Sequence, residues 1–172
     1  MTNKNLRRLI LISLFSALSV IGGFIKVPSP VGSIALDSFP ALLAAAILGP
    51  LAGTAVGGIG HLLSALSGGM VMGPFHYLIA LEMALLCALF SFLYRKGRHW
   101  FAGTVFLLGN SIVAPFPFYF LLGTNMYKGL VPYLFIASLL NTVFALVIIP
   151  RLSRVLASKK GAGDERCTDC SV

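Results

Sequence analysis

Charged residues are scarce in this 172-residue chain: Asp, Glu, Lys and Arg make up only 10% of it, while 58% of its residues are hydrophobic. Soluble globular domains carry about 25% charged residues, because a fold in water needs a polar surface. The scarcity therefore excludes an ordinary soluble domain. Apolar tracts recur almost to residue 156, so we expect an integral membrane protein rather than a secreted domain behind a removable signal peptide.

Motifs typical of several enzyme classes and of metal centres are missing as well. No segment reads G-x-x-x-x-G-K-[ST], so the chain has no ATP-binding loop of this type, and H-E-x-x-H is also absent. Cys167 and Cys170 form a C-x-x-C pair without the second pair or histidine cluster that would complete a zinc site. We therefore expect no enzyme, no metal and no cofactor, and we predict that residues 157–172 form a flexible cytoplasmic tail.

The formal net charge of +8 raises nucleic-acid binding as one class of function. The basic residues, however, gather at the chain ends and in the loop 95–99, without interleaved aromatic residues. In membrane proteins, Lys and Arg near the ends of spans collect on the cytoplasmic side. Six spans place eleven of the thirteen basic residues inside and leave only Lys26 and Lys128 outside. The charge pattern thus predicts six spans, cytoplasmic termini and no nucleic-acid partner.

The predicted fold is an all-α integral membrane protein, a compact bundle of six transmembrane helices within residues 1–156. Gly49-Pro50 divides the long central apolar stretch, because proline lacks a backbone donor and disfavours helix in the residue before it. Pro115 and Pro117 should kink the fifth span near its outer end. Turn residues and a rough apolar alternation over 26–38 are consistent with a short hairpin in the first outer loop. The expected spans are 6–25, 39–48, 51–67, 73–94, 100–122 and 130–156.

Small residues and caps refine this arrangement. Asp37 or Ser38 can cap the second helix. Ser13-x-x-x-Ala17 in the first helix is a small-residue pattern that could face either a helix of this chain or another subunit. Glycines at three- and four-residue spacings in the third helix should let neighbouring backbones approach closely: Gly53, Gly57, Gly58 and Gly60.

Polar side chains within the spans gather at mid-depth or nearer the outer side. Glu82 lies roughly 12 Å below Gly73, at ~1.5 Å of rise per residue. An ionisable group at such depth costs ~2.5–3.5 kcal/mol on insertion scales, so it normally faces a cavity or a partner. We expect Glu82 and His61 to anchor a ligand. The structural alternatives are a neutral Glu82 bonded to a neighbouring helix and an interhelical hydrogen bond for His61.

Further candidate ligand contacts surround these two residues. Asp37 and His76 are expected at the rim, although residues 76 and 82 lie ~120° apart on a helix and need not enter one pocket. Asn110 and Asn141 lie near the middle of the fifth and sixth spans, where either ligand binding or helix–helix hydrogen bonding fits. The outer loop 66–73 adds two adaptable methionines over the same end. Five aromatic residues could stack on a flat ligand: Phe39, Phe75, Tyr77, Tyr119 and Tyr127.

Over residues 6–156 the chain resembles the substrate-binding S components of energy-coupling factor (ECF) vitamin transporters of prokaryotes. The resemblance is strongest in IKVPSPVGSIALDSFPALLAAAILGPLAGTAVGGIGHLLSAL and GPFHYLIALEMALLCALFSFLYRKG. It implies a multi-pass protein of the prokaryotic plasma membrane that binds a vitamin or its precursor on the outer side. It also implies a transmembrane coupling subunit and two cytoplasmic ATPases as partners. In the family, the first helix docks on the coupling subunit through Ala-x-x-x-Ala; Ser13 and Ala17 hold the equivalent positions, with serine in place of the first alanine.

Within this family the sequence is most similar to the subgroup linked to α-ribazole, the nucleoside that supplies the lower ligand of cobalamin, and pantothenate binders are also similar. No arginine lies at outer depth, so a carboxylate ligand would lack the charge-assisted bond that offsets its desolvation. The candidate residues therefore suit a neutral ligand rich in hydroxyls. A different class of function stays open: a stand-alone proton- or cation-coupled carrier in which Glu82 titrates.

Overall fold

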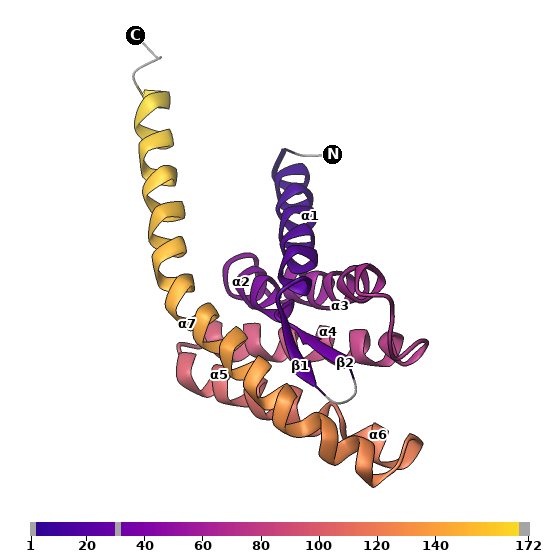
Figure 1. Cartoon of the computed structure of the whole chain (residues 1–172). Coiled ribbons are helices and arrows are strands. Elements are labelled where there is room, and N and C mark those ends of the chain that lie inside the picture. The colour runs from indigo at the N-terminus through magenta and orange to yellow at the C-terminus, as the bar shows by residue number, and fades with distance from the viewer. Residues whose placement is uncertain (1–2, 30–31, 169–172) are drawn as a thin grey trace.

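The computed structural model describes residues 3–29 and 32–168, with side chains described at residues 3, 5–25 and 36–154. Within that part of the chain, six helical segments form the bundle, as the hydropathy pattern predicted (Figure 1). They are α1 (Asn3–Gly23), α2 (Ser38–Leu48), α3 (Pro50–Ser67), α4 (Phe75–Arg95), a composite of α5 (His99–Leu108), η1 (Gly109–Val113) and α6 (Phe116–Leu121), and α7 (Thr124–Thr168).

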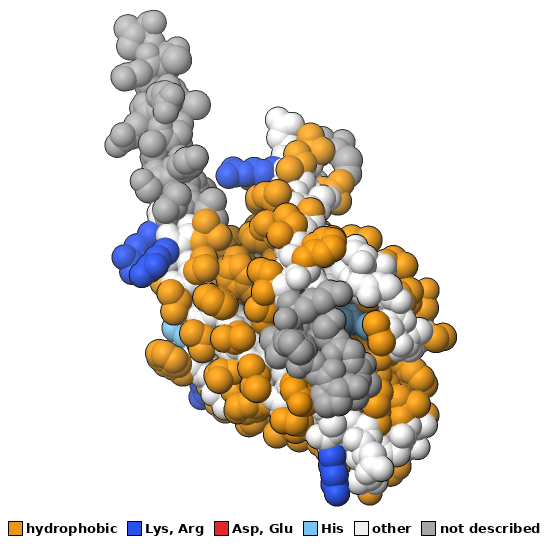
Figure 2. All heavy atoms as spheres, viewed as in Figure 1, with side chains coloured by type: hydrophobic (Ala, Val, Ile, Leu, Met, Phe, Trp, Pro, Cys, Tyr) orange, Lys and Arg blue, Asp and Glu red, His pale blue; other side chains and the backbone are white. Residues whose placement is uncertain are grey.

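The outside of the bundle is apolar. Large hydrophobic side chains such as Leu51, Leu81 and Trp100 are more than half exposed, at 74%, 58% and 82%. Figure 2 shows hydrophobic side chains over most of the visible face, with Lys and Arg at its extremities. Such a surface is favourable in lipid and not in water. Four described stretches are long and apolar enough to cross a membrane, Asn5–Gly23, Phe75–Arg95, His99–Leu121 and Thr124–Arg154, and the chain is a multi-pass membrane protein.

The predicted break in the central apolar stretch is confirmed. Gly49 separates α2 from α3 with φ of 98°, a left-handed backbone conformation that glycine adopts without a steric penalty. Pro50 follows as the first residue of α3, where its missing N–H would have no intrahelical acceptor. The two short helices therefore meet at a sharp turn rather than forming one kinked span.

Glycines place α3 at the centre of the bundle. A Cβ atom added at Gly53 would lie 2.6 Å from the Cβ of Ala45 in α2, and one at Gly60 would lie 2.8 Å from Ser19 Oγ in α1. Toward α4, a Cβ at Gly57 would lie 2.9 Å from the Sγ of Cys87. These approaches are closer than a larger residue permits, so the predicted packing role of the α3 glycines is confirmed.

The fifth span is broken near its prolines, as predicted. Pro115 has no N–H, so the carbonyl four residues earlier lacks its usual α-helical donor. The chain responds with the π-turn η1, in which the Ala114 N–H donates to the Gly109 carbonyl at 2.8 Å. The distortion therefore begins one turn before Pro115 itself. Such π-turns occur frequently at functional sites.

The first outer loop forms the expected hairpin. Strands β1 (Lys26–Ser29) and β2 (Gly32–Ala35) pair antiparallel, with Lys26 opposite Ala35 and Ser29 opposite Gly32. The hairpin ends at Ala35, and Leu36 connects it to Asp37, which precedes α2. It therefore brings the chain to Asp37, at the end of the bundle that holds the candidate site.

The last helix extends further than the predicted sixth span. α7 continues to Thr168 and so runs through most of the predicted tail. Pro132 and Pro150 lie inside it, and each removes a backbone hydrogen bond. Figure 1 shows that α7 bends along its length and that the start of α1 and the end of α7 lie at the same end of the molecule. Cys167 belongs to the last turn of α7, Cys170 lies outside the described residues, and the flexibility of the tail stays a prediction.

Candidate functional site

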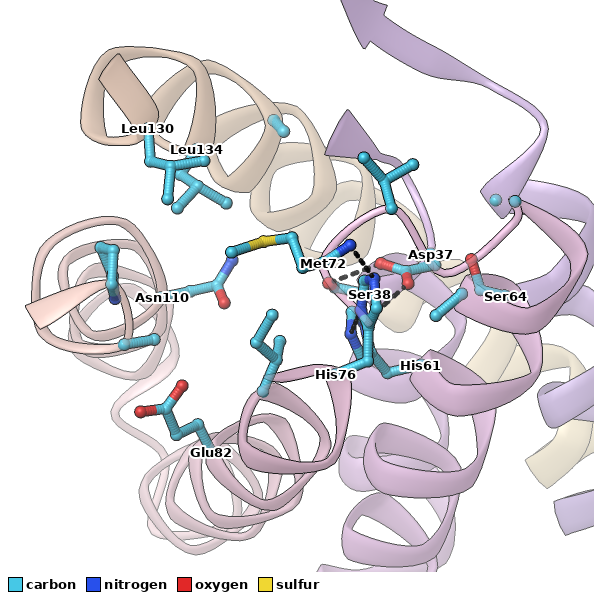
Figure 3. Close-up of a pocket in the computed structure, with 18 of the residues that line it drawn as sticks. Asp37, Ser38, His61, Ser64, Met72, His76, Glu82, Asn110, Leu130 and Leu134 are labelled. Atoms are coloured by element: carbon cyan, nitrogen blue, oxygen red, sulfur yellow. Dashed lines mark hydrogen bonds and ion pairs between the residues drawn. The ribbon is translucent and has the colours of Figure 1, made fainter. Parts of the chain in front are cut away.

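A cavity of about 150 Å³ lies inside the bundle, where α3, α4, the α5–α6 break and α7 meet (Figure 3). Only two acidic residues precede residue 157, Asp37 and Glu82, and both line this cavity. The cavity also brings together the four other predicted polar residues, His61, His76, Asn110 and Asn141. His76 and Glu82 therefore share one pocket in spite of their angular separation on α4.

Glu82 lies at one end of the cavity and has an unpaired polar atom there. Its Oε2 atom is buried and has no hydrogen-bond partner within the described part of the chain. Figure 3 places its carboxyl group on the opposite side of the cavity from Asp37. Leaving a buried polar atom unpaired costs about 1–3 kcal/mol, so such atoms in native proteins usually have a functional explanation. The alternative that a neighbouring helix satisfies Glu82 does not account for Oε2.

The opposite end of the cavity holds a row of hydrogen bonds, here called the histidine row: Asp37, His61 and His76. His61 Nδ1 lies 3.1 Å from Asp37 Oδ2, and His61 Nε2 lies 3.3 Å from His76 Nδ1. His76 Nε2 in turn accepts a hydrogen bond from the backbone N–H of Met72 at 3.4 Å. The Ser38 hydroxyl donates to the remaining carboxylate oxygen of Asp37, at 3.3 Å. The row thus links the residue before α2 with α3, α4 and the outer segment 68–73.

The directions of these hydrogen bonds follow from the Met72 amide, which can only donate. His76 Nε2 must therefore carry no proton, and a neutral His76 carries its proton on Nδ1. That Nδ1–H donates to His61 Nε2, so the proton of His61 lies on Nδ1 and is donated to Asp37. One assignment, with two neutral imidazoles and an ionised Asp37, satisfies every contact. The three residues follow one another in a line. In the described part of the chain, no group of three or more His, Cys, Asp or Glu residues is arranged to hold a metal ion.

The two asparagines have different roles. Asn141 is buried, accepts a hydrogen bond from the Phe39 N–H at 2.7 Å and donates to the Ala137 carbonyl at 2.9 Å. It therefore caps α2 from α7. Asp37 holds the N-cap position of α2, but the expected side-chain cap is wrong for it, because its carboxylate is directed to His61. The Ser38 hydroxyl donates to Asp37 instead of capping the helix.

Asn110 belongs to the η1 π-turn and projects into the cavity (Figure 3). Its Nδ2 donates to Ser138 Oγ at 2.6 Å, a contact that orients the amide. Its carbonyl oxygen is therefore presented as an acceptor on the same side of the cavity as Glu82. This arrangement combines the two roles that the sequence left open, a helix–helix hydrogen bond and a polar group for a ligand.

The predicted aromatic residues do not line the cavity. Phe39 packs edge-on against Phe144 at 6.3 Å, Tyr77 is 64% exposed, and Tyr119 and Tyr127 pack against each other at 6.0 Å. The aromatic residue that does line it is Phe118, with Ile79, Leu130 and Leu134 as apolar neighbours. Phe75 contributes indirectly, because its ring packs edge-on against Phe118 at 5.5 Å. In the sequence Phe118 follows Pro117 directly, but Phe116 also adjoins this proline and is exposed, so the position does not single out Phe118.

Ser13 and Ala17 lie on the outside of α1. Both are exposed, whereas Phe15, Ser16 and Ser19 of the same helix are buried against the bundle. Of the two alternatives for this small-residue pattern, a helix of this chain is therefore not its partner within the residues whose side chains are described. The pattern is free for another membrane helix or for lipid.

Residues 7–156 match the family model of the ECF transporter, substrate-specific component. The chain belongs to this family. Among solved structures, this ECF component is similar to a chain described as the S component of a bacterial ECF transporter, with 23% identity and a TM-score of 0.62 over 88% of this chain and 98% of that one. At this identity the likeness shows a shared fold. No curated protein matches this ECF component. Family membership makes it the substrate-binding subunit of an ECF importer, and such components are transporter subunits of a membrane complex, not enzymes.

Proposed function

We propose that this ECF component captures its cargo in the cavity between α3, α4 and α7, with Glu82 as the polar anchor. The buried, unpartnered Oε2 of Glu82 is the observation that carries the proposal. The carbonyl oxygen of Asn110 supplies a second acceptor nearby, and Phe118 supplies an apolar wall. The free polar groups at this end accept hydrogen bonds, so the complementary cargo is one that donates them.

We propose α-ribazole as the cargo, with pantothenate as the alternative. Among the side chains that the structure describes, no Lys or Arg lines the cavity, while Asp37 and Glu82 do. The carboxylate of pantothenate would enter beside two acidic groups without a cation to offset its desolvation. A nucleoside brings hydroxyl donors for Glu82 and a flat base that can pack against Phe118.

The cavity must widen before a nucleoside can enter. Its volume is about 150 Å³, whereas pockets for drug-sized ligands measure about 300–1,000 Å³. Part of its lining is the outer segment 68–73, which contributes Met70, Val71 and Met72. Methionine is unbranched and flexible, so this side of the cavity can yield more readily than the packed helices. The described conformation therefore corresponds to a contracted site.

The decisive experiment is calorimetric titration of the purified protein in lipid nanodiscs with α-ribazole and, separately, with pantothenate. We expect α-ribazole to bind and Glu82→Gln to weaken it about 10- to 100-fold, the range for a hydrogen bond to a charged group. Tyr77→Phe, on the same helix but outside the cavity, should leave the affinity unchanged. Equal affinity of Glu82→Gln and wild type would reject Glu82 as the anchor. Tighter binding of pantothenate would reject α-ribazole as the cargo.

A further inference from the structure

The histidine row connects the binding cavity to the outer segment 68–73 through one backbone hydrogen bond. We propose that Asp37, His61 and His76 are positioning residues rather than ligand contacts: they hold segment 68–73 closed over the cavity through the Met72 amide, and one added proton releases it. The inference rests on the proposed function only in taking this cavity as the cargo site.

In this conformation, neither His61 nor His76 has a ring nitrogen that is free to bond to a ligand. Both nitrogens of His61 are engaged, one with Asp37 and one with His76. Both nitrogens of His76 are engaged as well, with His61 and with the Met72 N–H. A ligand bond to either imidazole would break a link of the row. The unsatisfied acceptor lies at the other end of the cavity, at Glu82.

The segment that the row holds has an uncommon backbone. Gly69, Met70 and Gly73 have φ of 88°, 44° and 55°. A left-handed conformation is unfavourable for Met70, which has a Cβ atom. The Met72 N–H is satisfied by a side chain from α4 rather than by a backbone carbonyl. Because Met70, Val71 and Met72 all line the cavity, loss of this bond would free the lining that has to move.

A proton added to either imidazole breaks a hydrogen bond of the row. If it binds His76 Nε2, an N–H faces the Met72 N–H, and two donors cannot bond. If it binds His61 Nε2, that N–H faces the N–H of His76 Nδ1, and the link between the two histidines is lost unless His76 gives up this proton and carries one on Nε2. In the second case the donor at Met72 again faces a donor. The intact row is therefore compatible only with neutral imidazoles.

Titratable groups on the surrounding elements define this response. Among described residues, the titratable side chains lining the cavity are Asp37 before α2, His61 on α3, and His76 and Glu82 on α4. The lining residues of the α5–α6 stretch and of α7 are not titratable. Within the row, His76 faces His61, and His61 faces Asp37. Asp37 thus fixes the tautomer of His61, and through it the tautomer that His76 presents to Met72.

The competing explanation is a local cap. His76 lies in the first turn of α4, and its side chain reaches back to an N–H four residues earlier, which needs neither His61 nor Asp37. The two explanations differ in whether Asp37, which does not contact Met72, controls the Met72 amide. Amide hydrogen exchange of Met72 in the full-length, ligand-free protein in nanodiscs measures this directly.

We expect His76→Ala to lower the protection of the Met72 amide about tenfold. His61→Ala removes the acceptor that keeps the His76 proton on Nδ1, and Asp37→Ala removes the acceptor that keeps the His61 proton on Nδ1. Both should lower protection by a smaller factor, because His76 then carries its proton on Nε2 in part of the population. Asp37→Asn keeps an acceptor for the His61 N–H and should retain protection. Ser67→Ala removes a hydrogen bond to the Leu63 carbonyl beside the segment and serves as the matched control without effect.

The pH profile is the second arm and needs no variant to fold. Corrected for intrinsic exchange, wild-type protection of Met72 should fall as the pH is lowered from about 8 to about 5, the range in which histidine titrates, and His76→Ala should show no such fall. The proposal would be overturned if the protection of Met72 in the wild-type protein did not change with pH. It would also be overturned if Asp37→Ala and His61→Ala kept the wild-type level of protection while His76→Ala lost it. Because no ligand is present, neither result depends on whether Glu82→Gln binds cargo.

Discussion

Asn141 and Thr142 are neighbours on α7 in opposite hydrogen-bonding situations. Asn141 bonds to Phe39 of α2 and to Ala137, whereas the buried Thr142 Oγ1 has no partner in the described part of the chain. Asn141→Ala should lower thermal stability, by about 1 kcal/mol, because the start of α2 loses its cap. Thr142→Val, which keeps the shape and removes the unpaired hydroxyl, should be neutral or stabilising. Thermal unfolding of both variants in detergent tests this, and equal loss in both would show that packing rather than the cap matters at Asn141.

For single residues, the sequence predicted which polar side chains meet in the cavity but not which aromatic side chain lies beside them. An ionisable group such as Glu82 in an apolar span is visible in sequence, because lipid penalises it wherever no cavity exists. Phe118 was missed in favour of its neighbour Tyr119. Since the π-turn changes the helical phase before both residues, counting at 3.6 residues per turn cannot tell which of them faces inward. The pairing of Asp37 with His61 depends on how α3 is rotated, which no local pattern encodes.

Among the elements, breaks and close contacts were predictable where backbone chemistry dictates them. Gly49-Pro50 ends one helix and begins the next because of what the two residues permit, and the α3 glycines mark a helix that neighbours approach closely. The extension of α7 to Thr168 was not predicted, since the polar end of this helix lacks the hydropathy signal used to define spans. Hydropathy sets where a helix can cross lipid and does not set where it ends.

We propose that the outward face of α1 docks on a transmembrane coupling subunit, as the resemblance to the family implies, and this proposal can be tested. Ser13→Trp or Ala17→Trp should leave cargo binding unchanged and abolish ATP-dependent uptake in cells that also express the coupling subunit and ATPases, because a bulky side chain prevents close helix approach. Leu18→Trp, exposed on the other flank of the same helix, is the matched control and should retain uptake. A stand-alone carrier would instead transport in cells that lack the partner subunits and would be indifferent to the first two changes.

At the scale of the whole molecule, the acidic and histidine side chains of the cavity lie in a bundle whose outside is hydrophobic. Hydrophobic burial cannot by itself hold helices together in lipid, so close packing and interhelical hydrogen bonds must do so. The α3 glycines and the Asn141 cap supply such contacts around the cavity. The tightly packed helices thus form the frame of the cavity, whereas the outer segment 68–73 is packed more loosely: a Cβ atom added at Gly69 or Gly73 would meet no atom within 4 Å. This difference between the helices and the outer segment explains why the polar groups of the site are already in place while the volume of the cavity is small.

The orientation of the bundle can be tested with the natural cysteines. The basic residues predict both termini inside the cell, and Cys167 and Cys170 lie near the C-terminus, whereas Cys87 is fully buried in the core. A membrane-impermeant thiol reagent should therefore label the wild-type protein only after the cells are permeabilised. Lys128→Cys, in a chain with Cys167→Ser and Cys170→Ser, should be labelled in intact cells, because residue 128 lies on the predicted outer side. Labelling of wild type in intact cells would place the tail outside and reverse the assignment of the cavity to the outer half of the membrane.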